Sequence, residues 1–165
     1  MKRELQKLLV EVKMARGKLR LWQNRLGMKA EQFRRLSVSN ATRFSSLAEQ
    51  YAKESEQLDN ILNYLNRLDV LFEMLEIKLE TIVYIDYISQ DLVSVVEALR
   101  EFKKATPMLS TELSILIDEF YTGFYESVQV PEPVRIKAKE EAKSILKESE
   151  TIANNRTQTK IGTKA

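Results

Sequence analysis

The 79 residues between Gly27 and Pro107 (28–106) contain neither glycine nor proline. A β-sheet needs a turn about every 8 to 12 residues, and turns are built largely from these two residue types. Long α-helices tolerate such a stretch. Since the whole chain has only four glycines and three prolines, the sequence predicts an all-α fold made of a few long helices.

Apolar residues recur every seven positions in the first 36 residues. One series is Leu5, Val12, Leu19, Leu26 and Phe33; its companion is Leu8, Ala15, Trp22 and Leu36, interrupted by Lys29. This a/d pattern is typical of a helix that packs lengthwise on another helix. The sequence therefore predicts that the first arm pairs with a second long helix.

The second arm repeats the pattern after a Ser/Asn/Thr-rich turn at 37–42. Its two series are Leu47, Ile61, Leu68, Leu75 and Ile82, and Tyr51, Leu58, Leu65, Phe72 and Leu79. Without a breaker before Pro107, we expect one helix that starts between 40 and 47 and runs to 105. The result is an elongated antiparallel hairpin over 1–105. The apolar segment 78–104 overshoots the first arm, so it either self-assembles or folds back at a hinge.

Three further segments follow Pro107. A short helix is expected over 110–127, which completes a helical core of residues 1–127. The linker 128–133 contains Pro131 and Pro133 and should be extended. We expect a C-terminal helix over 134–152 and a disordered tail over 153–165, which is polar and has no apolar stripe.

Charge divides the chain sharply. Residues 1–43 carry 12 Lys/Arg against three Asp/Glu, and residues 44–133 carry six against 17. The basic arm can pair with the acidic arm and keep the protein soluble, or it can bind an anionic partner.

Composition argues against several function classes. The chain has no cysteine and no histidine, which removes the commonest nucleophile–base pairs and metal ligands. No glycine-rich phosphate loop is present. We expect no enzymatic activity and no cofactor. We also expect a cytoplasmic protein, because the N-terminus is too charged for a signal peptide and no apolar run is long enough to span a membrane. If the chain inserts into a membrane, Met1, Leu5, Leu8 and Leu9 are the expected residues.

Two segments carry a resemblance to a known family. The run 75–100 (LEIKLETIVYIDYISQDLVSVVEALR) is followed, after Pro107, by the acidic string 113–120 (LSILIDEF). Together with the charge split, this order resembles the ESCRT-III family, and within it a short archaeal CdvB-type cell-division protein without a winged-helix tail. The resemblance covers about residues 1–127.

The resemblance implies a subunit that switches between closed and open forms and polymerises on membranes to constrict and divide them. The expected setting is cell division or vesicle budding, on the inner face of the cell membrane at the division site. Implied partners are further copies, ESCRT-III paralogues, anionic membrane and an AAA+ ATPase with an MIT domain. The predicted polymer contacts are Phe33, Leu36, Phe44, Leu47, Ile145 and Leu146. A faint ATPase-binding motif comprises Val130, Pro131, Pro133, Val134 and Ile136.

The basic arm supplies the predicted membrane-binding residues, which are Lys2, Arg3, Lys7, Lys13, Arg16, Lys18, Arg20 and Arg25. The alternative function is a coiled-coil adaptor or scaffold. A nucleic-acid binder is a weaker alternative, because the arm lacks interleaved aromatic residues for base stacking.

Overall fold

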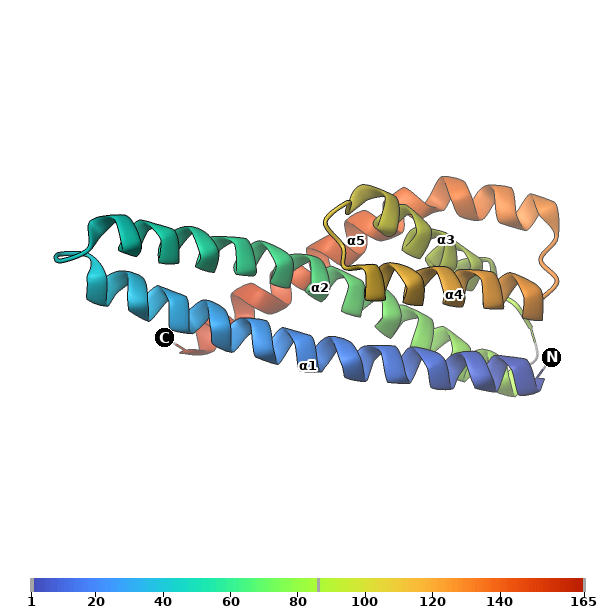
Figure 1. Cartoon of the computed structure of the whole chain (residues 1–165). Helices are drawn as coiled ribbons and strands as arrows, with labels where there is room; N and C mark the ends of the chain where they lie inside the picture. Colours follow the sequence, from blue (N-terminus) through green and yellow to red (C-terminus); the bar gives the residue numbers. More distant parts are fainter. Residues whose placement is uncertain (1, 86, 165) are drawn as a thin grey trace. The chain divides into compact units, whose positions relative to one another are not determined.

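The structure is a computed structural model that describes residues 2–85 and 87–164, with side chains placed for 3–85 and 87–158. Five α-helices and no strand occur in this part of the chain: α1 (Lys2–Asn40), α2 (Ser45–Ile85), α3 (Gln90–Ala105), α4 (Thr111–Ser127) and α5 (Glu132–Lys164). Figure 1 shows their order. The all-α fold is confirmed.

Two compact units divide the chain. Gly17–Asn66 form the tip unit, and Met1–Arg16 with Arg67–Ala165 form the five-helix unit. Each unit contains part of α1 and part of α2.

The tip unit is an antiparallel pair of helices. Its seam contains Leu19 and Ala30, both fully buried, and the rings of Phe33 and Tyr51, whose centroids lie 5.7 Å apart. Near the turn, the Ser37 hydroxyl donates a hydrogen bond to the Ala48 carbonyl at 2.9 Å. The expected turn at 37–42 starts too early, because α1 continues to Asn40. The Asn40 side-chain amide folds back over the last turn of α1 and donates a hydrogen bond to the Leu36 carbonyl at 2.7 Å.

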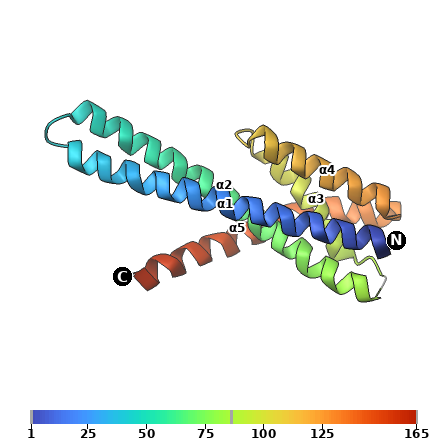
Figure 2. The same cartoon turned by 60° about the horizontal axis from the view of Figure 1, so that its bottom comes forward.

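In the five-helix unit, α3 is the central helix. Every residue from Leu92 to Leu99 is buried, and α3 packs on both α4 and α5. Figure 2 shows α3 between these two helices. A helix that is buried on all sides has apolar residues on every face, and the sequence of 92–99 is apolar except for Ser94 and Glu97.

The expected continuous helix to 105 is wrong, because the chain breaks between α2 and α3. Ser89 caps α3: its backbone is extended, and its side chain accepts a hydrogen bond from the Leu92 amide at 3.2 Å. Asp86 lies outside the described residues. Of the two alternatives for the overshooting segment, the structure has the fold-back, because α3 packs on α4 and α5 of its own chain.

The C-terminal segments also differ from expectation. Helix α5 begins at Glu132, so Pro133 lies in its first turn, where a missing N–H costs nothing. The Pro131 carbonyl accepts from the amides of Val134 and Arg135, at 3.1 Å each. Helix α5 then runs to Lys164, so the part of the predicted disordered tail that the structure describes, 153–164, is helical instead; Ala165 lies outside the described residues. Ala153 is only 4% exposed, which shows that packing holds this segment.

Candidate functional site

Five of the eight predicted membrane-binding cations are exposed and form no ion pair within the residues that the structure places. They are Arg3 and Lys7 in the five-helix unit, and Lys18, Arg20 and Arg25 in the tip unit. Each guanidinium or ammonium is therefore available to an external anion. The side chain of Lys2 lies outside the described set.

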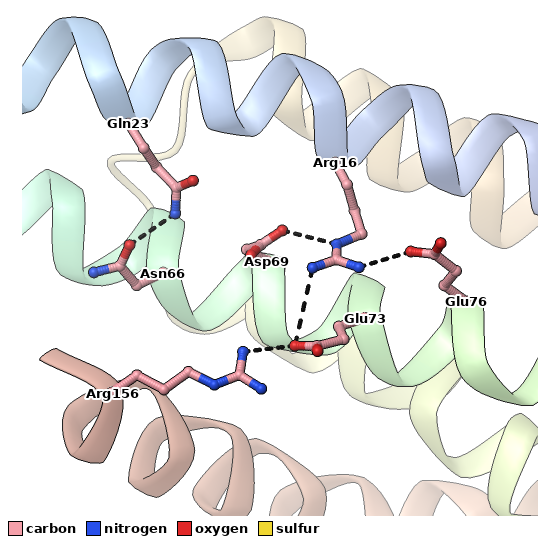
Figure 3. A network of polar contacts seen from close by, with 7 residues as sticks. All are labelled: Arg16, Gln23, Asn66, Asp69, Glu73, Glu76 and Arg156. Atoms are coloured by element: carbon pink, nitrogen blue, oxygen red, sulfur yellow. Dashed lines mark hydrogen bonds and ion pairs between the residues drawn. The ribbon is translucent and has the colours of Figure 1, made fainter. Parts of the chain in front are cut away.

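Arg16 does not face solvent. Its side chain is 14% exposed, and its guanidinium lies 3.1 Å from Asp69, 2.7 Å from Glu76 and 3.9 Å from Glu73 on α2 (Figure 3). Burial lowers the pKa of Arg16, but the hydrogen bonds to Asp69 and Glu76 outweigh burial, so the pKa is raised and the charge is kept. In this conformation three carboxylates surround the Arg16 guanidinium, so it is not available to a membrane; its role in membrane binding stays a prediction.

Lys13 is an intermediate case. Its ammonium lies 3.3 Å from the Glu80 carboxylate, with both side chains about half exposed. A pair of this kind is weak in water, because solvent screens it. Lys13 therefore remains a predicted membrane-binding residue.

Two ion pairs join α2 to α5. Arg156 on α5 lies 2.6 Å from Glu73, one of the carboxylates around Arg16, and Arg67 on α2 lies 3.0 Å from Glu150 on α5. The helical spacing of Asp69, Glu73 and Glu76 places them on one face of α2. That spacing was visible in the sequence, but their common partner was not.

A second polar cluster, which the sequence did not predict, joins α3, α4 and α5. The Tyr121 hydroxyl donates to the Glu97 carboxylate at 3.1 Å and accepts from Arg100 at 3.1 Å and from Arg135 at 3.3 Å. Glu97 is only 2% exposed. The Arg135 guanidinium also stacks over the Tyr125 ring, 4.2 Å from its centroid. A buried carboxylate requires such partners, so this cluster fixes how the three helices meet.

Tyr125 has an unusual hydroxyl. It is buried without a hydrogen-bond partner, as is Glu97 Oε2. Burial, and then the nearby charge of Glu97, raise the pKa of Tyr125 well above its ordinary value.

Helices α3 and α5 are joined by small residues and by polar contacts. Ala138 and Ala142 are fully buried on α5, which lets the two helices approach closely. The Ser94 hydroxyl donates to Glu141 at 2.7 Å, and the Gln90 amide donates to the Val134 carbonyl at 3.0 Å. These contacts use the inward face of α5.

The predicted polymer contacts lie on different surfaces. In the tip unit, Phe44 and Leu47 are exposed and line an open depression with Arg43, Ser45, Ser46 and Gln50, whereas Phe33 and Leu36 are half-buried. Ile145 and Leu146 on α5 are half-buried in the five-helix unit. Their role in assembly stays a prediction.

The predicted ATPase-binding residues surround the start of α5. Pro131, Pro133 and Ile136 are exposed, whereas Val130 and Val134 are half-buried. The segment is helical from Glu132 onward, so the expected extended motif is not extended in this conformation. Binding of an ATPase here stays a prediction.

The apolar residues expected to insert into a membrane are not available. Leu5 is fully buried, Leu8 is 3% exposed, and Leu9 is half-buried. Leu8 lies beside α4, where a Cβ atom at Gly123 would meet its side chain at 3.8 Å. Met1 lies outside the described residues.

The placed residues contain neither a cluster of metal ligands nor a membrane-spanning helix. No group of three or more acidic residues there is arranged to hold a metal ion. No helix there has the length and apolarity to cross a membrane.

Comparison with known proteins identifies a relative. No family model and no solved structure matches the chain. It is 35% identical over 156 residues to Cell division protein B3 of Sulfolobus acidocaldarius, and the match covers 92% of each chain. Because this identity extends over nearly the whole of both proteins, the chain belongs to the CdvB family of ESCRT-III-like cell division proteins.

Proposed function

We propose that this protein is a filament subunit that assembles on anionic membrane during cell division and helps to constrict and divide it. Its relationship to a protein named Cell division protein B3 supports a cell-division role. The proposal adds the membrane, the filament and the location at the division site, on the inner face of the cell membrane. We propose no enzymatic step for the chain itself.

One observation carries the membrane proposal: five basic side chains of α1 are exposed and have no ion pair within the described chain. A basic residue near an anionic bilayer contributes about 1 kcal/mol, so three acting together give on the order of a hundredfold in partitioning. Filament assembly multiplies the effect, because each added subunit brings its own basic residues to the same surface.

The filament part of the proposal concerns the tip unit and α5. Phe44 and Leu47 are exposed in the tip unit and are proposed to receive Ile145 and Leu146 of another copy or a paralogue. Because Ile145 and Leu146 are half-buried and α5 is attached to α3 and α2, α5 has to detach before it can reach a neighbour. Binding of an MIT-domain ATPase near Pro131 would act on the same helix.

The proposal is tested by negative-stain microscopy and sedimentation of the full chain with three partners. These are neutral phosphatidylcholine vesicles, vesicles with equal amounts of phosphatidylcholine and phosphatidylglycerol, and duplex DNA. The proposal predicts filaments on the anionic vesicles and sedimentation that falls as salt rises, because exposed charges are screened over about 8 Å at physiological ionic strength. Equal binding to neutral vesicles, or filaments only with DNA, would contradict it.

A further inference from the structure

The apolar side chains that α1 exposes are not those of its seam. Val10 is 55% exposed and Met14 62% exposed in the five-helix unit; Leu21 is 57% exposed and Met28 75% exposed in the tip unit. We call these four residues the α1 ridge. Val10 and Met14 are four residues apart, and Leu21 and Met28 are seven apart, so within each unit the two residues lie on one side of the helix. The buried seam residues Val12 and Leu19 lie on the opposite side.

The charges beside the α1 ridge have one sign. At about 100° per residue, the arc of α1 within about 60° of Val10 in the five-helix unit, and within about 60° of Leu21 in the tip unit, contains no Asp or Glu. The basic residues within the same arc are Arg3, Lys7, Lys18, Arg25 and Arg35, all of them exposed. The three acidic residues of α1 (Glu4, Glu11 and Glu31) lie about 80° or more away. The same arrangement of apolar and basic residues thus occurs in both units.

The α1 ridge is too narrow to pack on another helix. A helix–helix seam needs apolar residues at both the a and the d positions of the heptad. Here Met14, Leu21 and Met28 supply one series, but Gly17 and Asn24 occupy the other. A Cβ atom at Gly17 would meet no placed atom within 4 Å, so this part of the ridge is uncovered.

A single file of apolar residues between Lys and Arg instead suits the boundary between lipid headgroups and acyl chains. Interfacial helices bury such a face while their basic side chains reach the phosphates. We propose that the α1 ridge inserts at this boundary of an anionic membrane, with the flanking Arg and Lys residues on the headgroups. This inference rests on the membrane function proposed above. It adds to the electrostatic attraction an apolar contribution to membrane binding, which high salt does not screen.

The absence of cysteine permits a direct test by site-specific labelling. Single cysteines at Met14, Leu21 or Met28 are labelled with the environment-sensitive fluorophore NBD and mixed with phosphatidylcholine/phosphatidylglycerol vesicles. Insertion predicts a blue shift, a rise in intensity and quenching by nitroxide-labelled lipids. Ile77 is the matched control: it is 58% exposed on α2 but lies among Glu73, Glu76 and Glu80, and its label should stay in water.

A second variant measures the apolar contribution. Replacing Met14, Leu21 and Met28 together by Gln should leave the fold intact, because all three side chains are already exposed. Sedimentation at low salt should change little, whereas the fraction bound at molar salt should fall about tenfold or more. The corresponding Ile77→Gln variant should bind as the wild type does.

The outcomes separate the inference from the function on which it rests. If the protein binds anionic vesicles but the ridge labels stay in water, the inference is overturned and the electrostatic proposal stands. If it binds no anionic vesicle even at low salt, both are overturned. If the ridge labels respond to protein concentration without vesicles, the ridge is a contact between copies, and the membrane inference is overturned.

Discussion

Arg16 on α1 donates a hydrogen bond of 2.7 Å to Glu76 on α2. The same guanidinium reaches Asp69 and, at a longer distance, Glu73. Arg16 therefore offsets a row of carboxylates that would otherwise repel one another within the five-helix unit. Its role is to hold α1 on α2, which differs from the role of the exposed cations around it.

Replacing Arg16 by Met should lower the free energy of unfolding by about 1–3 kcal/mol, because the carboxylates remain in a partly buried site without their cation. Lys18→Met is the matched control: it removes the same charge from an exposed position and should change stability by under about 0.5 kcal/mol. Urea unfolding monitored by circular dichroism measures both. Equal midpoints for the two variants would contradict a structural role for Arg16.

Tyr121→Phe removes the hydroxyl that joins α3, α4 and α5. Glu97 then loses the hydrogen bond to one oxygen while it remains buried, which should cost about 1–3 kcal/mol. Tyr84→Phe is the control, since Tyr84 is 87% exposed and should unfold as the wild type does. If both variants are equally stable, the cluster around Tyr121 does not hold the helices together.

Tyr125→Phe should behave differently. The Tyr125 hydroxyl is buried without a partner, so its removal at neutral pH should be neutral or slightly stabilising. The pKa of Tyr125 is raised in the folded protein, so the phenol ionises more readily in the unfolded chain. Below about pH 10 the phenol is neutral in both the folded and the unfolded protein, so its ionisation does not affect stability; as the pH rises above that value, the unfolded chain ionises first and the folded protein loses stability.

The measurement is the unfolding free energy of wild type and Tyr125→Phe from pH 8 to pH 11, by urea titration. We expect the wild type to lose stability above about pH 10 more steeply than the variant does. Parallel curves for the two proteins would show that Tyr125 is not buried as described.

Ala142→Leu tests the close approach of α5 to α3. Ala142 is fully buried, and the larger side chain should cost about 1–3 kcal/mol by overpacking. Ser144→Leu makes a similar change at an exposed position and serves as control. If detachment of α5 precedes assembly, Ala142→Leu should also form filaments at a lower protein concentration than the control. If Ala142→Leu lowers stability but leaves filament assembly unchanged, detachment of α5 is not a step that precedes assembly.

The sequence predicted the all-α fold and the antiparallel pairing of its first two helices, because a seven-residue series of apolar residues is a local pattern that can be recognised in the sequence of each helix alone. It did not predict the break after Ile85, since the apolar stripe continues through it and no glycine or proline marks it. Only Ser89, as a helix cap, signals that break. The helical extent of α5 was underestimated because the residues after Ile152 are mostly polar, and the buried Ala153 raises the hydropathy of that segment little.

The functional residues were predicted less completely than the fold. The excess of positive charge on the basic arm was visible in the sequence. Composition cannot distinguish a cation that forms ion pairs with α2, such as Arg16, from an exposed cation without an ion pair, such as Arg20. The cluster around Tyr121 draws Glu97, Arg100 and Arg135 from helices far apart in the sequence, and no short motif indicates it. The α1 ridge became apparent only when the structure showed which apolar side chains the seam leaves exposed.

The most direct test of the account compares two charge-reversed proteins that carry the same change in net charge. One replaces Lys18, Arg20 and Arg25 by Glu on α1, and the other replaces Lys139, Lys143 and Lys147 by Glu on α5; all six side chains are exposed. Sedimentation with phosphatidylcholine/phosphatidylglycerol vesicles at low salt is measured, with circular dichroism as the check on folding. The account predicts that the α1 variant loses binding by on the order of a hundredfold or more, whereas the α5 variant binds nearly as the wild type does. Equal loss in both variants, or undiminished binding of the α1 variant, would contradict it.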